Sequence, residues 1–402
     1  MNASEPGDAI FTFDFLAVSL INLLVMAAYY LLFVISGPYA VAVFNASPGT
    51  SGLVAGVMVL GCLAGRFVCG RLIEVIGFKK VLYAGFFAYI AGIALYLAVS
   101  SLPLLLAIRL FSGIGIGCIG TVTGTLIARI VPSHKRGLGL SYFSLSTIIA
   151  LAAGPFFGIF LMQRMTFSEL FLLCLGLGAL SLVLALFVRL PGAEAPETRR
   201  GHPALGDFIE FTVVPLCLTI LLAGVCYGCI QAFIATHAAH AGLEGVASFY
   251  FLAYAAVVFL TRPLTGRLID ARGENPVAYP ALILMALSLF LLARADSAWM
   301  LLLSGALLGA GYGNFQSVAQ VTCIKLVPRH RFGQATSTFF IFLDLGVGLG
   351  PYALGQLVPS LGYNGLFMAA AAVACLAIPL YHTLHGRKEH THAAPLTDKL
   401  AH

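Results

Sequence analysis

Long apolar runs limit the possible folds of this chain more than any other feature. Runs bounded by charge, glycine or proline lie near 15–36, 51–72, 81–100, 103–130, 138–162, 167–189, 209–236, 246–269, 277–294, 298–327, 334–359 and 364–384. They have about the 20 residues that cross a bilayer as a helix, and they lack the period-2 alternation of membrane barrel strands. A soluble core could not bury them, because only 9% of the residues are charged, against about 25% in soluble proteins. The sequence therefore predicts an all-α membrane protein with twelve transmembrane helices.

The longest polar segment divides these runs into two sets of six. "RLPGAEAPETRRGHPALGD" (189–207) separates the sixth run from the seventh. We expect an N-terminal six-helix bundle at 1–188, a cytoplasmic linker at 189–208, a C-terminal six-helix bundle at 209–385 and a cytoplasmic tail at 386–402. Because no basic region precedes the first apolar run, we interpret that run as a retained helix and not as a cleaved signal.

Basic residues are concentrated on one side of the expected membrane. One set of loops and ends holds Arg71, Lys79, Lys80, Lys135, Arg136, Arg189, Arg199, Arg200, Arg267, Arg272, Lys325, Arg329, Arg331, Arg387, Lys388 and Lys399. The opposite set holds only Arg164 and Arg294. Since cytoplasmic loops retain basic residues, we expect both termini in the cytoplasm and the protein in the inner (plasma) membrane. The net charge of +6 is then a topology signal, and it predicts no nucleic-acid partner.

The two sets of runs are internal repeats. "GRLIE" at 70–74 recurs as "GRLID" at 266–270, so that the glycines are 266 − 70 = 196 residues apart. Three further landmarks keep this spacing, at Arg66 and Arg262, Pro132 and Pro328, and Pro155 and Pro351. Agreement at four places indicates parallel repeats related by an axis along the membrane normal.

The repeated loop resembles the signature loop of the major facilitator superfamily. The pattern Gly-x-Leu-x-Asp-x-x-Gly-x-Lys/Arg-Lys/Arg is matched by Gly70, Leu72, Glu74, Gly77, Lys79 and Lys80, with Glu in place of Asp. The second copy keeps Gly266, Leu268, Asp270 and Gly273 and loses the basic pair to Glu274 and Asn275. The resemblance covers essentially the whole chain and implies two pseudo-symmetric six-helix bundles that alternate access to a central cavity.

The resemblance also implies a conformational latch in these loops. Its residues would be Gly70, Arg71, Glu74, Gly77, Lys79, Lys80, Gly266, Arg267 and Asp270. Glu74 would contact the start of the eleventh span near Gly333 to Thr336, where a helix N-terminus offers partial positive charge, and Asp270 would do the same for the other half.

Two further segments are similar to proton-coupled exporters of this superfamily. "RLFSGIG" supplies Arg109, Gly113 and Gly115, and "ALAAGPFFG" supplies a Gly-Pro element in the fifth span. The upstream glycines of that element are replaced here by Ser, Thr and Ala, and the remaining Gly-Pro element favours antiport. Proline removes a helical hydrogen bond, which makes Gly154, Pro155, Gly350 and Pro351 candidate flex points.

Two charged residues inside apolar spans are candidates for proton coupling. Arg109 costs roughly 2.5–3.5 kcal/mol in lipid, so it should face the bundle interior. There it could tune a titrating group, bind an anion, or only pack through carbonyls. Asp344 lies well inside the eleventh span, where burial and a nearby cation would oppose each other in setting its pKa. It could bind and release protons, or stay paired for structural reasons.

Polar side chains in three spans are candidate contacts for a substrate in the cavity. They are Asn22, Tyr29, Tyr30, Tyr227, Gln231, Asn314, Gln316 and Gln320. Each could instead form a hydrogen bond between helices. The remaining cavity would be apolar, which suits a moderately hydrophobic substrate.

Metal and cofactor sites have little support. Cys226 and Cys229 form a CxxC inside an apolar run, where zinc or redox partners are lacking. His237, His240 and Glu244 could bind metal or sense pH, but a solvated loop explains them as well. The polar segments contain no nucleophile elbow or phosphate loop. We therefore expect no metal, no cofactor and no enzyme activity.

These observations favour a secondary transporter. We expect it to export a small, moderately hydrophobic drug or metabolite in exchange for protons, as a monomer in the lipid bilayer. A proton symporter for uptake and a membrane receptor that does not transport are the alternatives.

Overall fold

A computed structural model describes residues 10–132, 135–189, 209–328 and 331–387. The side chains at positions 70, 71, 74, 136, 137, 141 and 270 lie outside this description, as do residues 190–208 of the expected linker and 388–402 of the expected tail. The chain divides into two compact units, Met1–Arg200 (unit 1) and Gly201–His402 (unit 2), and each is described by itself.

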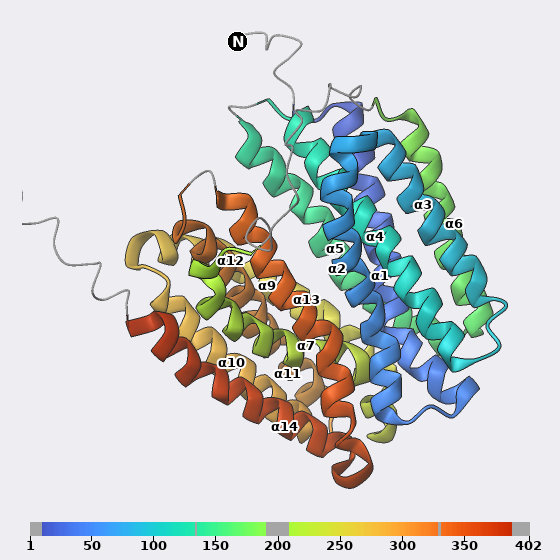
Figure 1. Cartoon of the computed structure of the whole chain (residues 1–402). Coiled ribbons are helices and arrows are strands. Elements are labelled where there is room, and N and C mark those ends of the chain that lie inside the picture. Colours follow the sequence, from blue (N-terminus) through green and yellow to red (C-terminus); the bar gives the residue numbers. More distant parts are fainter. Residues whose placement is uncertain (1–9, 133–134, 190–208, 329–330, 388–402) are drawn as a thin grey trace, which may run out of the picture. The chain divides into compact units, whose positions relative to one another are not determined.

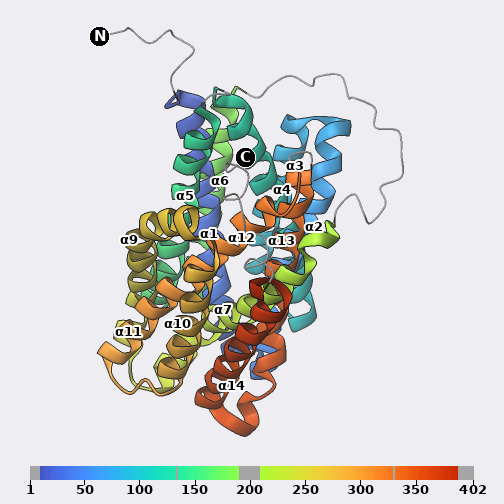
Figure 2. The same cartoon turned by 90° about the vertical axis from the view of Figure 1, so that its left-hand side faces the viewer.

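The described part of unit 1 is a bundle of six long helices (Figures 1 and 2). They are α1 (Phe13–Phe44), α2 (Pro48–Ile76), α3 (Phe78–Tyr96), α4 (Leu102–Ile130), α5 (Arg136–Met162) and α6 (Phe167–Phe187). Local signals set several of their starts. Ser47 accepts a hydrogen bond from the Thr50 N–H before Pro48, and Thr166 and Glu169 form a reciprocal capping box. Helix α2 packs along α4, and α1 packs along α5.

Unit 2 has the same order of spans with shorter helical pieces. They are η3 (Phe211–Val213), α7 (Val214–His240), α8 (Glu244–Ala247), α9 (Phe249–Arg272), α10 (Asn275–Ala293), α11 (Ala298–Leu308), η4 (Gly309–Gly313), α12 (Asn314–Lys325), α13 (Phe332–Gly355), α14 (Val358–Tyr381) and η6 (His382–Gly386). Helix α13 packs along α7, and α14 packs along α10.

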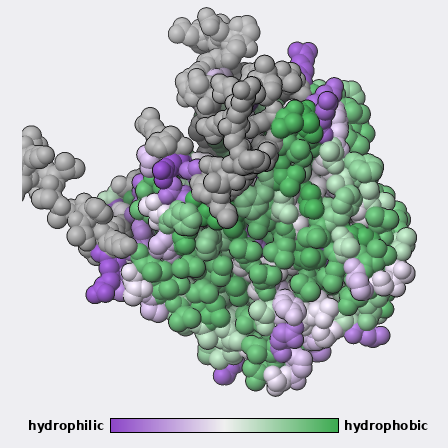
Figure 3. Space-filling view, viewed as in Figure 1, coloured by the Kyte–Doolittle hydropathy of each residue, from purple (hydrophilic) through white to green (hydrophobic). Residues whose placement is uncertain are grey.

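The twelve expected spans are confirmed. Among the described residues, eleven helices are long and apolar enough to cross a membrane. The tenth span of the chain runs through α11, η4 and α12, where a π-helical turn at Gly309–Gly313 interrupts the α-helix. Figure 3 shows apolar residues along the sides of the helices and hydrophilic residues gathered near their ends. Such a surface suits hydrocarbon along the helices and water at their ends.

The 196-residue repeat is visible in the packing of glycines. A Cβ on Gly113 in α4 would collide with the carbonyl oxygen of Met58 in α2, and one on Gly309 would collide with that of Tyr254 in α9. Both members of this contact are shifted by 196 residues. Two further contacts repeat in the same way. Gly115 is in close contact with Gly85 and Tyr89, and Gly311 with Ala281 and Met285. Gly117 is in close contact with Cys62, and Gly313 with Val258. The two units therefore share their close helix contacts as well as their order of spans.

The repeated loop ends α2 and α9 at equivalent glycines. Gly77 has φ 85° and Gly273 has φ 82°, a left-handed backbone conformation that disfavours residues with a Cβ. Because 273 − 77 is 196, the two loop copies are aligned without a gap.

This alignment corrects one detail of the sequence analysis. The prediction that Glu274 and Asn275 replace the basic pair at 79–80 is wrong by one residue. The pair corresponds to positions 275–276, and Glu274 corresponds to Phe78.

Candidate functional site

Arg109 connects four helices of unit 1. It lies seven residues after the start of α4 and is fully buried, with 0% exposure. Its Nη1 donates to Ser36 Oγ and to the Leu32 carbonyl oxygen in α1, and to the Tyr96 hydroxyl in α3 at 3.3 Å. Its Nη2 donates to the Ala55 carbonyl oxygen in α2 at 3.1 Å. The planar, forked guanidinium can serve all these acceptors at once, which a lysine ammonium could not do.

The charge of Arg109 is balanced by dipoles. All of its hydrogen-bond acceptors in the described part of unit 1 are carbonyl or hydroxyl oxygens, and its Nε has no hydrogen-bond partner there. A buried cation without a carboxylate keeps its positive field. The arrangement therefore both fastens the helices and leaves a fixed charge inside unit 1.

Asp344 lies at the middle of α13 in unit 2. It is twelve residues from Phe332 in a helix of 24 residues, and it is 8% exposed. At this level α13 is in close contact with α7, since a Cβ on Gly224 would lie 2.8 Å from the carbonyl oxygen of Leu343. A carboxyl group inside a membrane span is costly, so Asp344 stays the candidate for proton coupling in unit 2.

An aromatic cluster lies where the tenth span contains its π-helical turn. Tyr312 of η4 stacks on Tyr227 of α7, with ring centroids 4.2 Å apart and an interplanar angle of 8°. The Tyr227 hydroxyl accepts a hydrogen bond from Gln231 Nε2 at 3.2 Å, and Tyr254 of α9 packs against the Tyr227 ring at 5.9 Å. Single π-helical turns occur frequently at functional sites, so this cluster is a candidate substrate contact within unit 2.

Asn314 follows the π-helical turn directly. Its Nδ2 donates to Thr261 Oγ1 at 2.9 Å and to the Ala310 carbonyl oxygen at 2.9 Å. Its Oδ1 accepts from Thr265 Oγ1 at 3.3 Å. Asn314 thus joins α12 to α9, while Gln316 and Gln320 are half-buried on the same helix.

The unit 1 members of the expected cavity set all lie on α1. Asn22 Nδ2 donates to Ser146 Oγ at 2.8 Å and to Thr147 Oγ1 at 2.9 Å. The Tyr29 and Tyr30 rings contact each other edge to face at 5.0 Å. The two hydrogen bonds of Asn22 Nδ2 link α1 to α5; a role of Asn22, Tyr29 and Tyr30 in substrate binding stays a prediction.

The two Gly-Pro elements lie inside unbroken helices. Pro155 is within α5 and Pro351 is within α13. A Cβ on Gly154 would lie 2.6 Å from the Ala27 carbonyl oxygen, and one on Gly350 would lie 2.6 Å from the Val225 Cα. These glycines permit close packing of α5 on α1 and of α13 on α7; their role as flex points stays a prediction.

The predicted latch is only partly described. Lys79 and Lys80 are exposed in the first turn of α3, and Gly266 and Arg267 are exposed near the end of α9. The side chains of the remaining polar members, Arg71, Glu74 and Asp270, and the surroundings of Gly70 lie outside the description. The latch stays a prediction.

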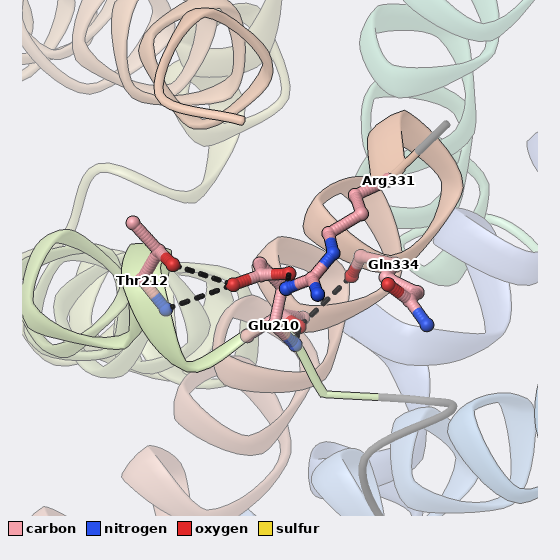
Figure 4. A network of polar contacts seen from close by, with 5 residues as sticks. Glu210, Thr212, Arg331 and Gln334 are labelled. Carbon is pink, nitrogen blue, oxygen red and sulfur yellow. Dashed lines mark hydrogen bonds and ion pairs between the residues drawn. The ribbon is translucent and has the colours of Figure 1, made fainter. Parts of the chain in front are cut away.

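A polar network around Glu210, with partners that the sequence did not indicate, fastens the start of α7 to the start of α13 (Figure 4). Glu210 Oε2 accepts from Arg331 Nη1 at 3.0 Å, and Glu210 Oε1 accepts from the N–H and Oγ1 of Thr212 at 3.2 and 2.5 Å. The Glu210 N–H donates to Thr338 Oγ1 at 2.8 Å, and Thr338 donates to the Gln334 carbonyl oxygen. The hydrogen bonds from Thr212 lower the pKa of the Glu210 carboxyl, with a smaller contribution from Arg331, although burial opposes them.

The repeat spacing could have revealed this network. Asp14 and Glu210 are 196 residues apart at the starts of α1 and η3. In unit 1, Asp14 Oδ1 accepts from the Arg189 N–H at 3.0 Å. Equivalent acids therefore fix both chain segments that border residues 190–208.

Removing the charge of Glu210 should destabilise unit 2 in a pH-dependent way. Glu210→Gln is expected to cost about 1 kcal/mol near pH 7, because Arg331 loses a charged partner but is half exposed to water. A lowered folded-state pKa gives stability that is present above the unfolded pKa of about 4.3 and lost as pH falls through the folded value. The difference in melting temperature between wild type and variant should therefore be constant from pH 6 to 8 and shrink below about pH 4.

The matched control for this prediction is Asp296→Asn, an exposed acid that bonds only its neighbour Ser297 among the contacts described. It should change the melting temperature little at any of these pH values. A Glu210→Gln difference that grew on acidification would contradict the assignment.

The histidines at the end of α7 have other partners than a metal ion. His237 Nε2 bonds the Leu292 carbonyl oxygen near the end of α10 at 3.0 Å, and the His240 ring packs against Tyr363 at 5.1 Å. No group of three or more potential metal ligands lies together within the described ranges. Cys226 and Cys229 are both buried, and Cys226 Sγ contacts the Ala370 carbonyl oxygen at 3.3 Å.

Comparison with known proteins identifies the family. A family model described as "Major Facilitator Superfamily" matches residues 18–293 and 216–400. The transporter YhhS of Shigella flexneri, described as an uncharacterized MFS-type transporter, is 28% identical over 346 residues, which cover 84% of each chain. An uncharacterized MFS-type transporter of Burkholderia mallei is 28% identical over 356 residues, which cover 85% of each chain.

Solved structures agree on the fold. A mutant of the nucleoside transporter NupG has a TM-score of 0.78 at 12% identity and covers 92% of this chain and 100% of its own. A bacterial homologue of the human lysosomal transporter Spinster, inward-facing and unoccupied, has a TM-score of 0.75 at 16% identity, with 95% and 98% coverage. A POT family transporter in complex with 5-aminolevulinic acid also has a TM-score of 0.75, at 14% identity and with 95% and 98% coverage.

The fold and these matches define a multi-pass membrane transporter and not an enzyme. The chain belongs to the Major Facilitator Superfamily. The resemblance drawn from the repeated loop is thereby confirmed.

Proposed function

We propose that this transporter exports a small, moderately hydrophobic molecule in exchange for protons by alternating access. It would act as a monomer in the inner (plasma) membrane with both termini in the cytoplasm, and the segment 189–208 would link two six-helix bundles. The observation that carries the proposal is Asp344, a buried carboxyl at the middle of α13. A carboxyl inside a membrane is costly, and such groups commonly mark proton or ion pathways.

Two features support a small organic substrate. The Tyr227–Tyr312 stack with Gln231 offers aromatic faces and an amide, a combination suited to a molecule with both apolar and polar parts. The structural neighbours include a nucleoside transporter and a transporter in complex with 5-aminolevulinic acid. Because one fold carries unrelated substrates, these neighbours suggest a size range and not a particular molecule.

Sealed vesicles containing the protein test the exchange. A panel of nucleosides, 5-aminolevulinic acid and amphipathic dyes is added outside while a dye reports the external pH. Antiport predicts that a transported compound acidifies the outside, because protons leave as the compound enters. Alkalinisation would indicate symport, and binding without flux would indicate a receptor; either result would overturn the proposal.

A further inference from the structure

The turn between α9 and α10 holds the C-terminal end of the last span. Asn275, the first residue of α10, is buried, and its Nδ2 donates to the Gly386 carbonyl oxygen at 3.0 Å. Its Oδ1 accepts from the Tyr381 hydroxyl at 3.0 Å. One amide side chain thus binds both ends of the π-helical segment η6.

Tyr279, one helical turn after Asn275, completes the contact. Its hydroxyl lies 2.7 Å from His382 Nδ1, and its ring packs edge to face on Tyr381 at 5.3 Å. Gly386 is required here, because a Cβ on it would collide with the Tyr279 hydroxyl. We call Asn275, Tyr279, Tyr381, His382 and Gly386 the C-terminal clasp.

A charge pair fastens the same turn to a third helix. Glu274 Oε1 accepts from Lys325 Nζ, near the end of α12, at 2.8 Å. Glu274 is buried, whereas the Lys325 side chain is 45% exposed. The pair therefore fixes the position of the turn more than it stabilises unit 2. The turn is therefore bound to the ends of α12 and α14 at once.

The equivalent turn of unit 1 has different side chains at the positions of Glu274 and Asn275. Phe78 takes the place of Glu274, and the Arg129 guanidinium lies over its ring at 4.6 Å. Lys79 takes the place of Asn275 and is exposed. The two copies of the loop have thus kept their backbone shape and changed their chemistry.

We propose that in unit 2 this turn is a fixed anchor for the C-terminal end of the chain and not a latch that opens. The C-terminal clasp holds α10 to the end of α14 and to η6, and Asn275 is its main positioning residue. The Glu274–Lys325 pair adds the end of α12. In the second loop copy, the residues that replace the motif fix the end of α14 and the segment η6.

Hydrogen exchange measured by mass spectrometry on the full chain tests the anchor. Asn275→Ala removes both hydrogen bonds to the clasp, so exchange of the amides at 381–386 should become about tenfold faster. Asn275→Asp keeps the acceptor for Tyr381 but places a carboxylate oxygen against the Gly386 carbonyl oxygen, so it should also make this exchange faster. Lys79→Ala, the equivalent change in unit 1, should leave these amides unchanged.

Two outcomes would overturn the proposal. One is exchange at 381–386 that does not respond to Asn275→Ala. The other is a bimodal mass envelope for this segment in the wild type, because that pattern reports a segment that opens as a unit, as a latch must. If Asn275→Ala does not fold, Tyr279→Phe provides the same test, since it removes only the hydroxyl contact with His382 and keeps the ring packing.

Discussion

Asp344→Asn is expected to abolish proton-coupled flux and to leave the protein folded. Asparagine has nearly the same shape as aspartic acid, so α13 should keep its close contact with α7. The amide cannot take up or release a proton near neutral pH, and flux driven by a pH gradient should fall to the level of vesicles without the protein. A carboxyl that serves as the proton site also predicts that the variant still exchanges substrate for substrate, because that exchange needs no net proton movement.

The experiment compares Asp344→Asn with wild type in vesicles with and without an imposed pH gradient. Glu210→Gln is a suitable control, since it also neutralises a buried acid of unit 2 but lies one residue before the membrane span. The control should lower stability slightly and retain the pH dependence of flux. A wild-type pH dependence in Asp344→Asn would remove Asp344 from the proton pathway.

The helices themselves could be predicted from local sequence because their causes are local. Apolar runs located the spans. The second run was expected from residue 51, and its helix α2 begins three residues earlier, at Pro48 after the Ser47 cap. The end of α2 was expected near residue 72, but the helix continues to Ile76 because the loop motif keeps helical hydrogen bonds until Gly77 turns the chain. The motif was therefore expected as a loop where it is largely the last turn of a helix.

The π-helical turn in the tenth span was not predictable in this way. Its glycines, at 309, 311 and 313, have the same spacing as those at 113, 115 and 117, and these lie in a regular α-helix. Tertiary contacts, such as the stacking of Tyr312 on Tyr227, accompany the difference. Sequence spacing alone contains no information on such contacts.

The candidate site, like the fold, could be predicted from the sequence only in part. Arg109 and Asp344 stand out in the sequence because a charge in an apolar run is rare, but the partners of Arg109 do not. Ser36 and Tyr96 are ordinary residues of apolar helices, 73 and 13 residues from Arg109 along the chain. Likewise, Glu274 and Asn275 were interpreted as a degenerate motif, because comparison with the first copy of the loop cannot reveal the contacts that these two residues make in unit 2.

Arg109→Ala is expected to destabilise unit 1 by about 2–4 kcal/mol. The change leaves a cavity and deprives the Tyr96 hydroxyl and Ser36 of a buried charged partner. Arg109→Lys should cost nearly as much, because a single ammonium cannot reach α1, α2 and α3 together. The control is Arg164→Ala, whose exposed guanidinium bonds the Phe160 carbonyl oxygen and covers the Phe160 ring, and which should change stability by less than about 1 kcal/mol.

Stability and coupling together distinguish the two roles of Arg109. If it only fastens helices, Arg109→Ala and Arg109→Lys should both lower the melting temperature, and the molecules that remain folded should keep wild-type proton coupling. If its fixed charge also sets the protonation of the transport cycle, Arg109→Ala should uncouple flux while Arg109→Lys, which keeps the charge, retains part of the coupling. We expect the second pattern, because within the described part of unit 1 the buried guanidinium meets carbonyl and hydroxyl dipoles and keeps a positive field that fastening alone does not require. Wild-type coupling in folded Arg109→Ala would assign the residue to packing.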